Sequence, residues 1–365
     1  MQSEEYFICE HLIIVDNDEK IPFSDEEECS NLFKRYGEKL RNVRFTTQFH
    51  SRQESFVTSH CHNLTHVSFE GVERCTPELW TILSNKVTRL DLSGCSISDL
   101  MLHQVPQLCP QLIALGLSNT ATNDKSLHVL TAPSSHIIHL DISFNGDISD
   151  SGVLCVVQNL TKLQSLNIEG NTDLTNLSLS HISTHCAGTL QTLFLNCGEV
   201  DDEGVAQCAP AFGEEPINEL LERCSHLRTL YLARFVRNSD ISDLSNVIKV
   251  LPDAVRNLTT LILGCQFVCE DNLIIVGKYC TGLQVLAIDD GDYIFPHQSL
   301  MGLVDGCVNL KEVYINLEII GEVIRSSVLG FALAFLDLWM KIRPGLVIQH
   351  VGYDWEYTKH NVMNI

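Results

Sequence analysis

Histidine, cysteine and aspartate residues gather at three places in the chain where their side chains could bind a metal ion. The three sets are His60, Cys61 and His62, with His66 nearby; Cys265 and Cys269; and Asp289, Asp290 and Asp292. Zinc needs about four ligands that converge as a tetrahedron, whereas adjacent residues of a strand point to opposite sides. The first set therefore fits packing better than metal binding. A zinc or redox role is a minor alternative for the second set. The third could hold a cation or a basic peptide but fits a solvated loop better.

Sequence patterns that carry catalysis do not occur in this chain. It holds no glycine-rich phosphate loop, no GxSxG, no HExxH and no set of protein-kinase motifs. We therefore predict no catalytic residues, no metal-binding residues and no cofactor, and we expect that the protein is not an enzyme.

Many of the 15 cysteines recur at fixed points of a longer pattern. Some come three residues before an aliphatic residue that opens a motif, or four in the case of Cys186, and others follow the motif: Cys61, Cys109, Cys186, Cys224, Cys280 and Cys307 precede it, and Cys95, Cys197 and Cys265 follow it. A thiol is small, easily buried and a weak donor, which suits a tight turn. Because the cysteines form no CxxC pairs, we predict free thiols throughout.

The motif itself is Leu-x-x-Leu-x-Leu, with Ile, Val or Phe in some copies. It begins at Leu40, Leu64, Val87, Leu112, Ile137, Leu163, Leu190, Leu227, Leu258, Leu283 and Leu310. From Val87 onward successive copies are 25 to 27 residues apart, except for intervals of 37 and 31 residues on either side of Leu227. This period lies in the range of leucine-rich repeats, and the two long intervals predict insertions near 197–226 and 234–257.

A repeat of this kind predicts a solenoid rather than a single globular core. Leu-x-Leu places two apolar side chains on one face of a short strand, and stacked repeats bury that face. Ile97-Ser98-Asp99, Ile148-Ser149-Asp150 and Ile241-Ser242-Asp243 are typical of helix starts after the strand. We predict an α/β leucine-rich-repeat solenoid of about eleven repeats, with a curved parallel sheet on the concave side and helices on the convex side. Residues 37–348 would form the solenoid, 1–36 a nonrepeating acidic cap or arm, and 349–365 a tail that covers the last repeat.

The arrangement C-x-x-L-x-x-L-x-L-x-x-C followed by Ile-Ser-Asp resembles the cysteine-containing repeats of F-box/LRR proteins and their relatives without an F-box. The resemblance implies a substrate-recognition or adaptor component of a Skp–cullin–F-box ubiquitin ligase, acting in ubiquitin-dependent protein degradation. We find no F-box in residues 1–36, so a second protein or a missing exon would supply the ligase contact. The alternatives are a leucine-rich-repeat receptor of a cullin–Elongin ligase and a noncatalytic scaffold or assembly factor.

The residues between the paired aliphatics predict the binding surface, because they point away from the core. In chain order they are Asp91, Gly116, Asp141, Asn167, Phe194, Tyr231, Ile262, Ala287 and Tyr314. Aromatic residues and arginine are enriched at protein interfaces. We therefore predict a protein partner on the concave face at Phe194, Tyr231, Arg234, Phe235, Arg237, Ile262 and Tyr314, and a smaller contribution from Asp91.

Composition narrows the class of partner. With 24 Lys plus Arg against 46 Asp plus Glu, the chain has a formal charge of −22, which disfavours nucleic acid and anionic membrane surfaces. The first residues carry Glu4, Glu5 and Glu10, whereas a signal peptide needs positive charge at this place. We therefore do not expect a secreted protein. We predict a monomer within a complex, located in the cytoplasm or alternatively in the nucleus, with no nucleic-acid and no membrane partner.

Overall fold

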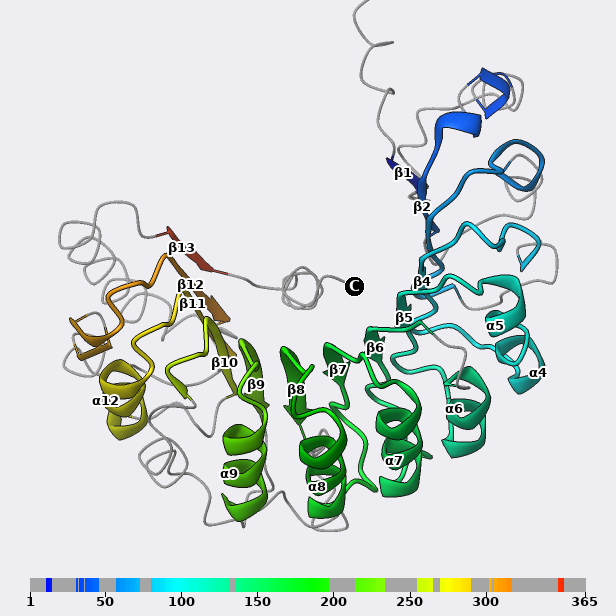
Figure 1. Cartoon of the computed structure of the whole chain (residues 1–365). Helices are drawn as coiled ribbons and strands as arrows, with labels where there is room; N and C mark the ends of the chain where they lie inside the picture. Colours follow the sequence, from blue (N-terminus) through cyan, green and yellow to red (C-terminus); the bar gives the residue numbers. More distant parts are fainter. Residues whose placement is uncertain are drawn as a thin grey trace, which may run out of the picture.

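One curved parallel sheet, with helices along its outer side, makes up the described part of the chain. The structure is a computed structural model, and it describes residues 11–14, 31, 33–35, 37–45, 57–72, 80–131, 136–196, 214–233, 255–264, 270–289, 302–303, 305–316 and 347–350. In these residues thirteen strands lie side by side in chain order. Figure 1 shows the strands on the inner side of an arc and the helices on its outer side. The predicted α/β solenoid with a concave sheet is confirmed.

The strands are three to five residues long, and every neighbouring pair is parallel. Their bounds are β1 His11–Ile14, β2 Asn42–Phe45, β3 His66–Ser68, β4 Arg89–Asp91, β5 Ala114–Gly116, β6 His139–Asp141, β7 Ser165–Asn167, β8 Thr192–Asn196, β9 Thr229–Ala233, β10 Thr260–Gly264, β11 Val285–Asp289, β12 Glu312–Asn316 and β13 Val347–His350. Strands β2 to β12 correspond one to one with the eleven copies of the motif. The register therefore follows directly from the leucine spacing.

Helices follow many of the strands and return the chain along the convex side. They are the 3-10 helix η2 Gly37–Lys39 and the α-helices α4 Asp99–Leu102, α5 Val105–Leu108, α6 Asp124–Leu130, α7 Asp150–Asn159, α8 Asn176–His185, α9 Glu214–Arg223 and α12 Glu270–Tyr279. Ser98 and Ser149 cap α4 and α7, as predicted, by accepting hydrogen bonds from backbone N–H groups. The predicted helix start at Ile241 lies outside the described residues. None of the described helices is long and apolar enough to cross a membrane.

The leucines of the motif form the core between the sheet and the helices. Leu90, Leu115, Leu140, Leu166 and Leu193 occupy equivalent places on successive strands, and each is at most 1% exposed. Burial of a leucine side chain contributes about 2 kcal/mol. No single repeat can bury this face alone, so stability depends on the stack.

A polar or thiol side chain follows several strands and closes the turn to the next segment. Asn145 donates from its Nδ2 atom to the carbonyl oxygens of Leu117, Ile142 and Ser143 at 2.8, 3.1 and 2.9 Å. At the matching place after β4, the Cys95 thiol donates to the Phe69 carbonyl oxygen at 2.8 Å. The predicted use of cysteine as a buried weak donor in an inter-repeat turn is confirmed at this position.

Aspartates at the helix starts join one repeat to the next. Asp124 accepts from the backbone N–H and the hydroxyl of Ser149 at 3.0 and 2.7 Å. Asp150 in turn accepts from the N–H and hydroxyl of Thr175, the N-cap of α8, at 2.9 and 2.6 Å. The sequence predicted Asp150 as a partner of its own helix end and made no prediction for Asp124. The structure adds that each one also holds the cap of the following helix.

The contribution of Asp150 to the stability of the folded protein is expected to be lost at acid pH. Burial raises the pKa of Asp150, but hydrogen bonds from Ser178 and Thr175 outweigh this effect and leave the pKa below its usual 3.8. A carboxyl group with a lowered pKa stabilises the folded state above its unfolded pKa, and this contribution is lost as pH falls through the folded pKa. We expect the difference in melting temperature between the wild type and Asp150→Asn to shrink when thermal melts are moved from about pH 6 to about pH 3. Asp147→Asn, at an exposed position, is the control and should show no such change.

Two strands extend the sheet beyond the eleven copies. β1 lies within residues 1–36, for which no repeat was predicted, and pairs with β2 from His11 to Ile14. β13 crosses the predicted end of the solenoid at residue 348 and pairs with β12. The boundaries at 37 and 348 stay predictions, as do the cap and tail. Of the predicted insertions, residues 214–226 are described and include α9, whereas 197–213 and 234–254 lie outside the described residues.

Candidate protein-binding surface

Three rows of side chains cross the concave face, because the outward residues of neighbouring strands lie in register. The central row runs in the predicted order from Asp91 to Tyr314, and it extends to Arg44 and Ser68 at its N-terminal end. A first row, two residues earlier on each strand, includes Arg89, Ala114, His139, Ser165 and Thr192. Two residues after the central row lie Ser93, Ser118, Ser143 and Glu169, and the hydroxyls of Ser118 and Ser143 are hydrogen-bonded at 2.9 Å.

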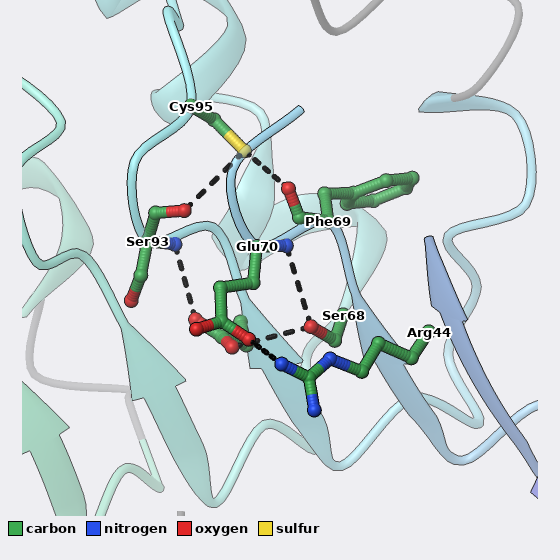
Figure 2. A network of polar contacts seen from close by, with 7 residues as sticks. Arg44, Ser68, Phe69, Glu70, Ser93 and Cys95 are labelled. Carbon is green, nitrogen blue, oxygen red and sulfur yellow. Dashed lines mark hydrogen bonds and ion pairs between the residues drawn. The ribbon is translucent and has the colours of Figure 1, made fainter. Parts of the chain in front are cut away.

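Polar contacts tie the N-terminal part of this face together. Arg44 and Glu70 form an ion pair across β2 and β3, and the Glu70 backbone N–H donates to the Ser68 hydroxyl at 3.3 Å (Figure 2). The Ser68 hydroxyl donates to Asp91 Oδ2 at 3.2 Å, and the Ser93 N–H donates to Asp91 Oδ1 at 3.0 Å. Asp91, Arg89, His66 and Ser68 are partly exposed. This part of the concave face is therefore both polar and open to a partner.

The aromatic part of the face is covered. Phe194, Tyr231 and Ile262 are 0%, 1% and 1% exposed, although the sequence predicted them as exposed contact residues. The rings of Phe194 and Tyr231 pack edge to face with centroids 5.4 Å apart. The expectation of exposure is wrong for these three residues, because strand alternation tells which side of a sheet a residue faces and not what lies over it. Their contact with a partner stays a prediction.

The other predicted contact residues divide into two groups. Tyr314 is partly exposed, and its hydroxyl donates to Glu312 Oε2 at 2.7 Å. Burial, followed by the nearby Glu312 carboxylate, raises the pKa of Tyr314 to about 12, so the phenol stays neutral. Arg234, Phe235 and Arg237 lie outside the described residues. Their predicted role is therefore untested.

The first row places an arginine and a histidine beside the acidic central row. Arg89 and His139 flank Ala114 on strands β4, β5 and β6. Burial and then the charge of Arg89 lower the pKa of His139 below 6.5. His139 is therefore neutral near pH 7, which leaves Arg89 as the cation of this row over β4 to β7. The other two rows carry three acidic side chains over the same strands, namely Asp91, Asp141 and Glu169.

The three sets weighed as candidate metal ligands do not form a metal site among the described residues. No group of three or more His, Cys, Asp or Glu side chains there could hold a metal ion. Cys61 is buried while His62 is exposed, in line with the packing role assigned to the thiol. Cys265, Cys269, Asp290 and Asp292 lie outside the described residues. Asp289 ends β11, and its side chain is not described.

Burial sets the chemistry of the repeat cysteines. All eight described cysteines are free thiols, and seven of them are buried. Desolvation is the largest cause that raises the pKa of Cys61, Cys109 and Cys186 to about 12, and that of Cys224 to about 11. These thiols are protonated at neutral pH and thus poor nucleophiles. Cys155 on α7 differs, because it is partly exposed.

We expect iodoacetamide to modify Cys155 first among the eight described cysteines of the native protein. The buried thiols should react only after unfolding, because alkylation needs both access and the thiolate. Peptide mass spectrometry after a timed reaction, with and without denaturant, provides the measurement. Disulfides between the buried cysteines, or native reaction of Cys109 or Cys186 as fast as that of Cys155, would contradict the packing role.

Comparison with known proteins agrees with the repeat and the fold. A family model described as Leucine Rich repeat matches residues 83–100 and 134–157. These segments span β4 with the start of α4, and β6 with most of α7. Together with the thirteen-stranded sheet, this match agrees with the predicted leucine-rich-repeat solenoid.

One curated protein and one solved structure are similar to this chain over most of its length. The chain is 28% identical over 261 residues to DNA repair protein rhp7 of Schizosaccharomyces pombe, which covers 69% of this chain and 43% of that protein. The chain therefore spans less than half of the length of this relative. Among solved structures, the crystal structure of the yeast Rad7 and Elc1 complex aligns with 74% of this chain and 63% of the matched chain, at 17% identity and a TM-score of 0.41.

Proposed function

We propose that the protein is a noncatalytic leucine-rich-repeat module that binds another protein on its concave face. The observation that carries this proposal is the polar, partly exposed concave face of β2 to β4, which includes Arg44, Glu70, Arg89 and Asp91. A curved sheet of this kind presents one rigid surface built from many repeats, which suits recognition of an extended partner. The acidic charge of −22 favours a basic or neutral protein over nucleic acid.

Within this function we propose a role as a substrate-recognition or adaptor component of a cullin-type ubiquitin ligase. The cysteine-containing repeat supports this role through its resemblance to F-box/LRR proteins. The similarity to rhp7, a DNA repair protein, favours the nucleus over the cytoplasm. A Skp-type and an Elongin-type ligase contact are both consistent with the repeat, and a scaffold role without ubiquitin is the alternative of a different class.

Affinity purification of the tagged full chain, followed by mass spectrometry, tests the proposed function. A ligase component should co-purify with a cullin and with either a Skp-type or an Elongin-type adaptor. The matched control is the Leu166→Asp variant, whose repeat array should be unfolded and should lose these proteins. Recovery of stoichiometric partners without a cullin would favour the scaffold, and recovery of no specific partner would overturn protein binding.

A further inference from the structure

A thiol and an imidazole meet on the convex side, where helices α6 and α7 pack against each other (Figure 1). Cys155 on α7 is the one described cysteine that is not buried, and its Sγ atom lies 3.4 Å from Nδ1 of His128 on α6. His128 is exposed. A nucleophile and a base are therefore in hydrogen-bonding contact at a place that solvent reaches.

The repeat does not account for a cysteine at this place. The other described cysteines lie at the turns next to the motif, whereas Cys155 lies within a helix, six residues after its N-cap. The matching places in α6 and α8 hold Val129 and His181, which are partly exposed as well. Because an aliphatic side chain and a histidine occupy the same place, packing of the repeats does not require a thiol there.

The contacts around the sulfur direct the thiol hydrogen toward the imidazole. Thr131 donates its hydroxyl hydrogen to the Leu127 carbonyl oxygen at 2.8 Å, so toward Cys155 Sγ, 3.7 Å away, it can only accept. Asn159 Nδ2 donates to Cys155 Sγ at 3.4 Å. The remaining neighbour is His128 Nδ1, which accepts when the ring hydrogen is on Nε2. It is closer to the sulfur than the Thr131 hydroxyl and is the stronger base.

Asn159 also holds the sulfur in place. It lies one helical turn after Cys155, so the two side chains share a face of α7. Its Nδ2 atom donates to Cys155 Sγ and lies 3.4 Å from the Thr131 hydroxyl at the end of α6. The amide therefore links the sulfur to the neighbouring helix. This arrangement keeps the thiol beside the base instead of turning freely in solvent.

We propose that Cys155 is a site of reversible modification by small disulfides from solution, with His128 as the base that takes the thiol hydrogen. As the Cys155 sulfur attacks one sulfur of the disulfide, a new S–S bond forms and the old one breaks. The leaving thiolate receives the proton that His128 carries. The Cys155 sulfur is oxidised and the released half of the disulfide is reduced to a thiol, so the exchange needs no further oxidant or reductant.

A mixed disulfide fits these surroundings better than an internal disulfide or a metal ion. The seven other described cysteines are buried, so none of them offers an exposed thiol to resolve the adduct. Zinc needs about four ligands, and no group of three or more suitable side chains occurs among the described residues. A small disulfide needs only one accessible sulfur and a base. The inference concerns the convex side and does not depend on a partner at the concave face.

Exchange with 2-hydroxyethyl disulfide, an uncharged probe, tests the proposal on the full chain. Peptide mass spectrometry of acid-quenched samples gives the rate at Cys155. His128→Gln keeps a polar side chain but removes the base. It should slow the native reaction about tenfold, less than the roughly 10²–10⁴-fold effect of an enclosed base, because His128 is exposed. His185→Gln makes the same substitution at an exposed position of α8 and should leave the rate unchanged.

The same reaction in urea separates the base from an effect on folding. Unfolding separates the two helices, so Cys155 should then react at the same rate in the wild type and in His128→Gln. A purely structural role for His128 would predict the opposite change in the native protein. Loosening α6 against α7 would expose Cys155 and speed its reaction, because exchange requires access. Slower native exchange with equal rates in urea therefore supports the base.

Three results would overturn the proposal. The first is a native rate at Cys155 that is as fast in His128→Gln as in the wild type, or faster. The second is equal slowing by His185→Gln, which would show an effect that is not specific to the pair. The third is an adduct that excess dithiothreitol does not remove, since a mixed disulfide is reducible. None of these results bears on partner binding, which affinity purification tests separately.

Discussion

Replacement of Leu166 with aspartate is expected to unfold the repeat array at temperatures at which the wild type is folded. Leu166 is fully buried in β7, at the centre of the sheet. The variant loses the burial of a leucine and places a carboxylate among apolar side chains, so we expect a loss of more than about 4 kcal/mol. Because each repeat packs only on its neighbours, the damage interrupts the stack near its middle. Circular dichroism melts of the purified variant measure the effect.

The matched control for Leu166→Asp introduces the same charge a few residues away. Thr161→Asp changes an exposed residue in the turn before β7 and should melt within a few degrees of the wild type. A wild-type melt for Leu166→Asp would mean that the leucines face solvent. The assignment of the two faces of every strand would then have to be reversed.

Tyr231→Ala is expected to destabilise the protein by about 3 kcal/mol, the cost of removing a buried aromatic side chain. The structure requires this result, because Tyr231 is 1% exposed and packs edge to face on Phe194. The sequence alone placed Tyr231 among the contact residues of the concave face, where its removal would change binding rather than stability. Thermal and urea melts decide between the two.

Tyr314→Ala provides the comparison on the same row. Tyr314 is partly exposed and makes one hydrogen bond to Glu312, so its truncation should cost less than that of Tyr231. Equal, small losses in the two variants would show that Tyr231 is solvated and that the aromatic part of the face is open to a partner. In that case the contact site predicted from the sequence would regain its support.

The strands and the core could be predicted because they depend on local spacing. Two leucines separated by one residue must share a face of a strand, and a repeat near 26 residues brings equivalent strands together. The register from Asp91 to Tyr314 follows from that rule alone. The capping roles of Ser98 and Ser149 could be predicted for the same reason, since a cap involves only the first turn of its own helix.

Features that depend on contacts between distant segments could not be predicted in this way. The burial of Phe194 is an example, because alternation gives the direction of a side chain but not its cover. The bond from Thr175 to Asp150 joins residues 25 positions apart, and no pattern within one repeat encodes it. Strand β1 carries no complete copy of the motif, so the sequence pattern did not predict it. Its place in the sheet is defined by its pairing with β2.

Carboxyl footprinting of the complex with the partner recovered by affinity purification tests protein binding on the concave face most directly. Carbodiimide labelling, read by peptide mass spectrometry, reports which carboxylates the partner shields. We predict shielding of Glu70 and Asp91 on the concave face and unchanged labelling of Glu222 and Asp271 on the convex helices α9 and α12. Shielding of Glu222 and Asp271 with full labelling of Glu70 and Asp91 would contradict the account and move the binding surface to the helices.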